Sequence, residues 1–88
     1  MSVRLREHVS ATDTTDALIL LDGRAGRYWQ LNTTAAIIVR ALLDGTDPAR
    51  IAQDLAAANP VSVQQASADL RALLAQLAKA NLIETATP

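Results

Sequence analysis

Residues 17–32, "ALILLDGRAGRYWQLN", contain two short strand-like segments joined by turn-forming residues. The first segment, residues 17–22, is apolar on both of its faces, as a central β-strand would be. The second, residues 27–31, alternates along its length as strand residues do. Since "DGRAG" between them supplies turn residues, the stretch predicts a β-hairpin. Its second strand carries the chain's only tyrosine and only tryptophan, Tyr28 and Trp29.

The residues before the hairpin predict a third strand. Their period of two is typical of a half-buried strand, and the alternating residues are Val3, Leu5 and Val9 with Arg4, Arg6 and His8. The polar stretch "SATDTTD", residues 10–16, is interpreted as a loop. If the first segment pairs with residues 17–22, the strand of residues 27–31 is left at an edge of the sheet. An exposed edge is a hazard unless something is meant to pair with it.

Three helices are predicted after the hairpin. Asn32, Thr33 or Thr34 can cap the start of "TTAAIIVRALLDG", and Gly45 is placed to end it. In "DPARIAQDLAAAN", the first residue is a natural N-cap, and the proline after it suits the first helical position. The third helix covers about residues 63–80. It opens with a capping box, Ser62 and Gln65, and Asn81 can take the left-handed position that closes it.

Apolar residues repeat along each predicted helix and define its inner face. These residues are Ala35, Ile38, Ala41 and Leu42, then Ile51, Leu55 and Ala58, and finally Ala66, Leu70, Leu73, Leu74 and Leu77. Strands followed by helices predict an α+β domain with one layer of helices over a small sheet. We therefore expect a three-stranded antiparallel sheet followed by a three-helix bundle, a winged-helix-like arrangement.

The composition predicts a single domain, residues 1–88, and disfavours several classes of partner. A net charge of −1, from eight basic and nine acidic residues, argues against a nucleic-acid or membrane partner bound through charge. The N-terminus lacks the continuous apolar stretch of a signal peptide. No apolar run approaches the roughly 18 residues of a membrane span, so a cytoplasmic protein is expected.

The groups that catalysis needs are scarce in this sequence. There is no cysteine, and the single histidine, His8, lies in a predicted strand, where an ordinary solvated role is expected. No His, Asp and Glu residues have metal-ligand spacing, and no glycine-rich loop is present to hold a phosphate. Asp44 and Asp47 have structural interpretations, as a helix end and a helix cap. We therefore expect no enzyme activity, no metal and no cofactor.

Two functions fit the remaining features, and the first is a winged-helix DNA-binding regulator. Residues 47–84 have the order of such domains, a helix, a turn and a longer helix ending in "NLIE". A recognition helix should carry several Lys or Arg residues on its outward face. The acidic residues of this region slightly outnumber Arg50, Arg71 and Lys79. The charge therefore disfavours DNA, which stays as the alternative.

The second function is peptide binding, and it rests on a resemblance. From about Ala17 to Glu84 the chain resembles the PqqD-like family of peptide-recognition proteins, the RiPP recognition elements, which act in the synthesis of modified ribosomal peptides. The motifs are the hairpin ending "LN", the helix ending "LLDG", and the final helix "DLRALLAQLAKANLI". Asp69 fits the family pattern, whereas Asn81 stands where glycine is usual. A free-standing domain of this size resembles the stand-alone recognition protein of lasso-peptide pathways, although other members are fused to larger enzymes or serve cofactor biosynthesis.

The resemblance implies a groove between the strand of residues 27–31 and the third helix. A precursor's leader peptide would enter this groove as an added strand, which satisfies main-chain groups on both partners but reads little sequence. Rigid aromatic side chains on the edge strand would supply contact area at low entropic cost. The candidate peptide-binding residues are Arg27, Tyr28, Trp29, Gln30, Leu31, Asp69, Leu70 and Leu73. For Trp29 and the leucines a core role is the alternative, and for Arg27 and Asp69 it is simple solvation.

The resemblance also implies partners. The expected function is a non-catalytic adaptor that binds the leader of a precursor peptide, most closely a lasso-peptide precursor. The adaptor would present it to a leader peptidase and then to a macrocycle-forming enzyme. The analogy further implies a leader that carries a tyrosine and, a few residues later, a proline, which would limit the added strand because proline cannot continue a ladder.

Overall fold

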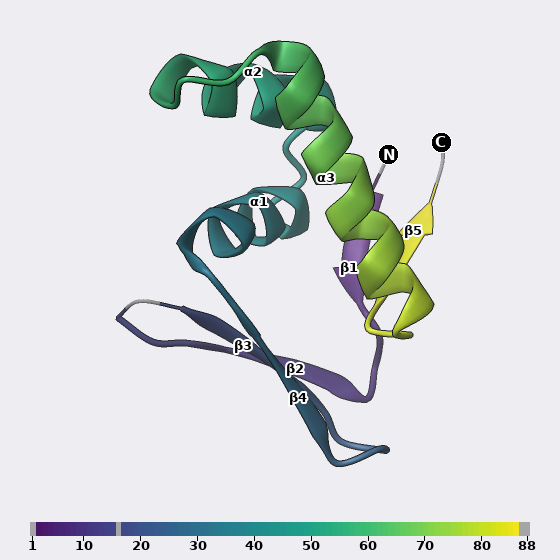
Figure 1. The fold of residues 1–88 in the computed structure, drawn as a ribbon. Coiled ribbons are helices and arrows are strands. Elements are labelled where there is room, and N and C mark those ends of the chain that lie inside the picture. The colour runs from purple at the N-terminus through teal and green to yellow at the C-terminus, as the bar shows by residue number, and fades with distance from the viewer. Residues whose placement is uncertain (1, 16, 87–88) are drawn as a thin grey trace.

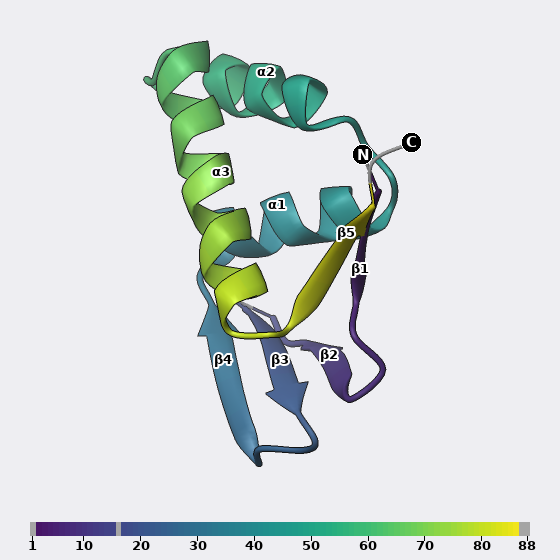
Figure 2. The same cartoon turned by 90° about the vertical axis from the view of Figure 1, so that its right-hand side faces the viewer.

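The computed structural model of the protein describes residues 2–15 and 17–86 (Figure 1). In chain order the elements are β1 (Ser2–Leu5), β2 (Val9–Asp13), β3 (Leu18–Asp22), β4 (Arg27–Leu31), α1 (Thr33–Leu43), α2 (Pro48–Ala58), α3 (Val63–Lys79) and β5 (Ile83–Ala86). Helices gather at one end of the molecule and the three-stranded sheet at the other (Figure 2). The predicted α+β class, with a three-stranded antiparallel sheet and three helices, is confirmed.

The three-stranded sheet has the order β2-β3-β4, and both of its pairs are antiparallel. The hairpin predicted from residues 17–32 is present, with Leu20 opposite Trp29 and Leu18 opposite Leu31. Both leucines of β3 in these pairs are buried. The strand order leaves β4 at an edge, as the sequence predicted.

The prediction of one strand over residues 3–9, followed by a loop, was wrong. The chain turns at residues 6–8, where the Val9 amide donates to the Arg6 carbonyl over 2.9 Å. The part before the turn, β1, pairs with β5 in a separate two-stranded sheet, and only the part after it, β2, joins β3. Residues 10–13, interpreted as a loop, belong to β2, and Asp16 of that predicted loop lies outside the described residues. Val3 and Val9 are both buried, but in two different sheets.

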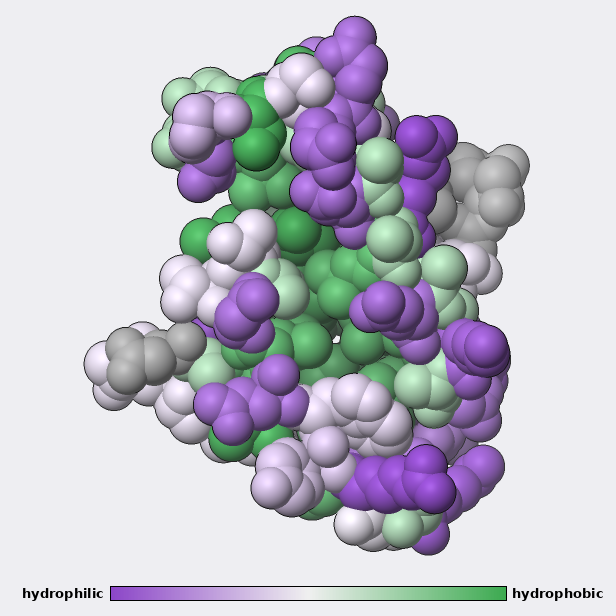
Figure 3. All heavy atoms as spheres, viewed as in Figure 1, coloured by the Kyte–Doolittle hydropathy of each residue, from purple (hydrophilic) through white to green (hydrophobic). Residues whose placement is uncertain are grey.

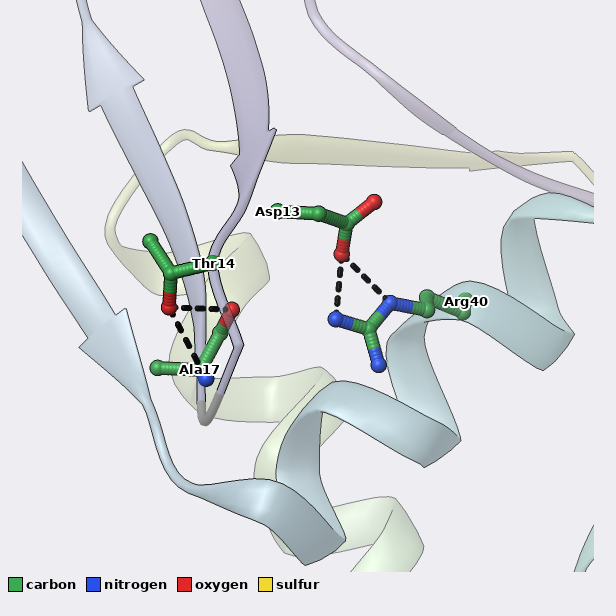
Figure 4. Close-up of polar contacts among 4 residues, drawn as sticks. All are labelled: Asp13, Thr14, Ala17 and Arg40. Atoms are coloured by element: carbon green, nitrogen blue, oxygen red, sulfur yellow. Dashed lines mark hydrogen bonds and ion pairs between the residues drawn. The ribbon is translucent and has the colours of Figure 1, made fainter.

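Side chains fix the turn between β2 and β3 and connect this hairpin to α1 (Figure 4). The Thr14 hydroxyl donates to the Ala17 carbonyl and accepts from the Ala17 amide, both over 3.0 Å. Asp13, at the end of β2, accepts from Arg40 of α1 through Nε at 2.6 Å and also through Nη2. Both side chains are substantially exposed, so this ion pair contributes no more than about 1 kcal/mol. It orients α1 on the sheet more than it stabilises the fold.

The helix ends follow the capping residues that the sequence offered. Asn32 caps α1, Asp47 caps α2 and Ser62 caps α3, each accepting from a main-chain amide of the first turn. The capping box at Ser62 is only half formed, because the Gln65 side chain donates to Asp69 at 2.8 Å instead. Asn81 has φ of 65°, the left-handed conformation predicted for it.

Each helix packs on a different part of the molecule. α1 lies on β1 and β4, whereas α3 lies against α2 and β5. Most predicted inner-face residues join one core, and the most buried side chains include Leu20, Val39, Leu82 and Ile83. The exceptions are Ala58, which is exposed, and five half-buried residues, Ala35, Ala41, Leu55, Leu73 and Leu74. The exceptions in α2 arise because that helix packs on α3 and contacts α1 much less.

Candidate peptide-binding site

The free edge of β4 is the main feature of the candidate site. Among the described residues, β4 pairs with β3 on one side and with no strand on the other. In a strand at a sheet edge, alternate residues direct their N–H and C=O groups away from the paired neighbour. Figure 2 shows β4 at the border of the sheet, on the side of the molecule along which α3 runs. The chain therefore offers a main-chain template beside a helix.

The pleat of β4 separates its side chains into two sets. Leu31 is buried, and Trp29 is half-buried and packs against the core, so these two face the helices. Tyr28 and Gln30 point to the other face, and Tyr28 is 69% exposed. Arg27 is exposed at the start of the strand. One aromatic side chain therefore borders the helical side of the edge, while the other lies on the outer face of the sheet.

The helix α3 supplies the opposite side. Leu73 and Leu74 are half-buried and pack on the same core as Trp29. Because α3 rests on α2 and β5, it is not closely packed on β4. Figure 3 shows hydrophobic residues gathered in a hollow down the middle of this face, with polar residues on both sides. A half-buried tryptophan on the unpaired edge strand and two half-buried leucines of α3 thus pack against one core.

Two predicted residues of α3 occupy different environments from Leu73. Leu70 is only 2% exposed and belongs to the core, so it holds the helix in place and offers little surface to a ligand. Asp69 is exposed, and one of its carboxylate oxygens accepts from Gln65. Trp29 and Leu73 are thus both half-buried against one core, whereas Leu70 lies inside that core and Tyr28 is exposed on the other face of the sheet.

Sequence reasoning overlooked two exposed apolar positions near the site. Leu74 was assigned to the core, but like Leu73 it is only half-buried. The two leucines are consecutive, so they widen the apolar stripe of α3, and both lie at the border of that stripe. Leu21 was expected to be buried in a central strand, yet it is 46% exposed opposite Tyr28. The outer face of β3 has no helix over it. A run of apolar residues in the sequence does not reveal whether helices cover one face of the sheet or both.

The turn between β3 and β4 is held by a carboxylate. Asp22 is buried, and its Oδ1 accepts from the amides of Arg24 at 2.9 Å and Ala25 at 3.0 Å. The His8 Nε2 lies 3.7 Å from the same oxygen. The Ala25 amide holds the pKa of Asp22 below its usual value, with smaller contributions from the Arg24 amide and the charges of His8 and Arg24, while burial acts in the opposite direction. The anchored turn fixes where the edge strand begins.

Metal-binding clusters and membrane-spanning helices are both absent from the part of the chain that the structure describes. Within residues 2–15 and 17–86, no group of three His, Asp or Glu side chains is placed to hold a metal ion. None of the helices in these residues is long and apolar enough to span a membrane.

Comparisons with known proteins identify the family. The family described as "Coenzyme PQQ synthesis protein D (PqqD)" matches residues 17–83, which is most of the chain. The chain belongs to the PqqD family. The resemblance inferred from the hairpin and helix motifs is thereby confirmed. No curated protein matches the chain.

Two solved structures resemble the protein over nearly its whole length. One, described as "Lasso peptide synthetase B1 complexed with the leader peptide", is 42% identical and has a TM-score of 0.92, with 97% of this chain and 100% of that chain covered. The other, "TbiB1 in Complex with the TbiA(beta) Leader Peptide", is 26% identical and has a TM-score of 0.85, with 97% and 99% covered. Both relatives were solved with a leader peptide bound, and the PqqD-family chain described here has their fold.

Proposed function

We propose that the protein is a non-catalytic adaptor, formed by residues 1–88 as one leader-binding domain, for a ribosomally synthesised precursor peptide of the lasso class. The observation that carries the proposal is the likeness over the full length to a B1 protein solved with its leader peptide. The free edge of β4 and the apolar hollow beside α3 supply a physical reason for such binding.

The leader would bind by strand addition to β4. Its main chain would complete the unpaired N–H and C=O groups that alternate residues of β4 direct away from β3, and alternate guest side chains would enter the hollow between β4 and α3. Burial of one aromatic guest side chain against Trp29 and Leu73 would contribute about 2 kcal/mol. Selectivity would come from these side-chain contacts, because main-chain pairing reads little sequence.

The adaptor would then present the bound precursor to a separate leader peptidase and to a macrocycle-forming enzyme. Holding the leader on a protein that these enzymes also contact raises the local concentration of substrate. Cleavage of the precursor by its peptidase should accordingly accelerate when the adaptor is added at sub-saturating precursor concentration. Equal cleavage rates with and without the adaptor would contradict the presentation step and leave leader binding intact.

Tryptophan fluorescence tests leader binding directly, because Trp29 is the chain's only indole. Titration with a synthetic peptide of the leader encoded beside this protein's gene should shift the emission, and calorimetry should give the same affinity. A scrambled peptide of identical composition is the control and should leave the emission unchanged. If the leader gives neither a shift nor heat, the protein is not its receptor.

A further inference from the structure

A second apolar groove lies between α1 and α2, apart from the hollow beside β4. Its volume is about 220 Å³, and its apolar lining comes from Ile37 and Ala41 of α1 and from Ile51, Leu55 and Ala58 of α2. Ile37 is 51% exposed, whereas the other large aliphatic residues of α1 are buried or half-buried. A large aliphatic side chain left in water at the mouth of an apolar groove is a feature of binding surfaces.

The groove exists because the two helices pack on different partners. α1 packs mainly on β1 and α2 mainly on α3, and the contact between α1 and α2 is as limited as that between α1 and β4. Each helix therefore keeps an apolar stripe that the fold does not cover. The sequence periodicity had assigned Leu55 and Ala58 to the core, and the structure leaves them half-buried and exposed along this groove.

The groove is continuous with the proposed leader site. β4 ends at Leu31, and α1 begins two residues later at Thr33. Ile37 is four residues beyond Thr33, which is about 6 Å of helix rise, or the length of about two extended residues. Figure 3 shows hydrophobic residues running from the notch between α1 and α2 into the hollow in the middle of the same face. A strand laid along β4 and extended past Leu31 would therefore reach the groove.

The direction of the guest strand follows from the sheet. Both existing pairs are antiparallel, and antiparallel pairing is slightly more stable per residue than parallel pairing. Because β4 runs toward α1, an antiparallel guest would direct its N-terminal end toward α1 and its C-terminal end toward Arg27. The segment that reaches the groove is therefore the one on the N-terminal side of the paired strand.

We infer that the α1–α2 groove binds one aliphatic or aromatic side chain of the leader peptide, from the residues just N-terminal to the segment paired with β4. The inference rests on the proposed function and adds a second contact point to it. A groove of this volume is sufficient for one such side chain, since an engineered apolar cavity of about 150 Å³ binds benzene. Two separated apolar contacts would also fix the register of the added strand, which main-chain pairing alone leaves free to slip.

A thermodynamic cycle between protein and peptide tests the inference. Ile37→Ser removes apolar surface from the groove at an exposed position, and Val63→Ser, at an exposed valine at the start of α3, is the matched control. Each protein is titrated with the full synthetic leader, with a leader lacking the N-terminal flank, and with one lacking the C-terminal flank. Circular dichroism checks that each variant is folded.

We expect Ile37→Ser to weaken binding of the full leader about fivefold, and Val63→Ser to leave it unchanged. The Ile37→Ser effect should vanish with the peptide that lacks the N-terminal flank and persist with the other truncated peptide. An equal affinity of wild type and Ile37→Ser for the full leader would overturn the inference while leaving the proposed function standing. A loss that vanishes on removal of the C-terminal flank would overturn the assigned direction. If wild type binds none of the peptides, the proposed function itself fails.

Discussion

At the scale of single residues, Asp22 holds the β3–β4 turn in place. It is the one buried acidic residue among the described residues, and it accepts from two consecutive main-chain amides of the β3–β4 turn. Its own carbonyl accepts from the Gly26 amide at 2.9 Å, and Gly26 has φ of 66°, in the left-handed region that favours glycine. The position of Arg27, where the edge strand starts, therefore depends on this carboxylate.

The lowered pKa of Asp22 predicts a specific pH dependence. Since the folded pKa lies below the ordinary value of 3.8, the carboxylate stabilises the fold above that pH, and this contribution is lost as the pH falls through the folded value. Asp22→Asn should unfold more easily than wild type at neutral pH, and the difference should shrink below about 3.8. Denaturant titrations of both proteins at stepped pH would measure it, and a constant difference down to the acid limit would contradict the assignment.

Leu73 and Leu70 predict opposite phenotypes although they lie on one helix. Leu73→Glu places a charge at the edge of the hollow, and we expect at least a tenfold loss of leader affinity in a folded protein. Ala75→Glu introduces the same charge at an exposed position of α3 outside the apolar stripe, and this variant should keep the wild-type affinity for the leader.

Leu70→Ala opens a cavity in the core, so the free energy of unfolding should fall by about 2–5 kcal/mol. Calorimetry and denaturant unfolding separate the two effects, and a Leu73→Glu protein with normal affinity would exclude α3 from the site.

At the scale of elements, strand addition to β4 has a signature with a period of two. In antiparallel pairing, only alternate guest residues donate their amides to the neighbouring strand. A series of leader peptides, each N-methylated at one successive position, should therefore lose affinity at alternate positions. Each lost hydrogen bond costs about 0.5–1.5 kcal/mol, to which the methyl group adds a steric clash. If affinity instead varies smoothly with the methylated position, or falls at one isolated position only, the leader binds through its side chains without joining the sheet.

The sequence predicted some of the secondary-structure elements correctly and others not. The β3–β4 hairpin and the three helices carry local signals: turn residues, caps at Asn32, Asp47 and Ser62, and a clear period. The division of residues 2–13 into β1 and β2 has no local signal, because it depends on pairing with β5 at the far end of the chain. The candidate site was predictable in its strand and only partly in its helix. A 3.6-residue period identifies an apolar stripe but does not reveal that Leu70 is covered while Leu73 is at its edge.

At the scale of the whole molecule, the arrangement separates stability from binding. β3 is paired on both sides, and the β1–β5 sheet brings the two ends of the described chain together, with Ile83 of β5 only 1% exposed. The surfaces proposed to contact the leader are the β4 edge, the hollow beside α3 and the α1–α2 groove, and the hollow and the groove open on the same face (Figure 3). On the proposed function, a leader peptide would therefore bind without opening the core.

The sheet has two edges, and hydrogen exchange distinguishes them. β2 is the other edge strand, so an added strand could in principle join it instead of β4. In the free protein we expect the amides of β3 to exchange slowly and the outward amides of both edge strands to exchange fast. Saturating leader should slow alternate amides of β4 and leave those of Ser10 to Asp13 unchanged, because we propose that the guest's side chains enter the hollow between β4 and α3. Protection that appears along β2 would relocate the guest to the far edge, where the exposed side chains after Val9 offer no apolar pocket comparable to that hollow.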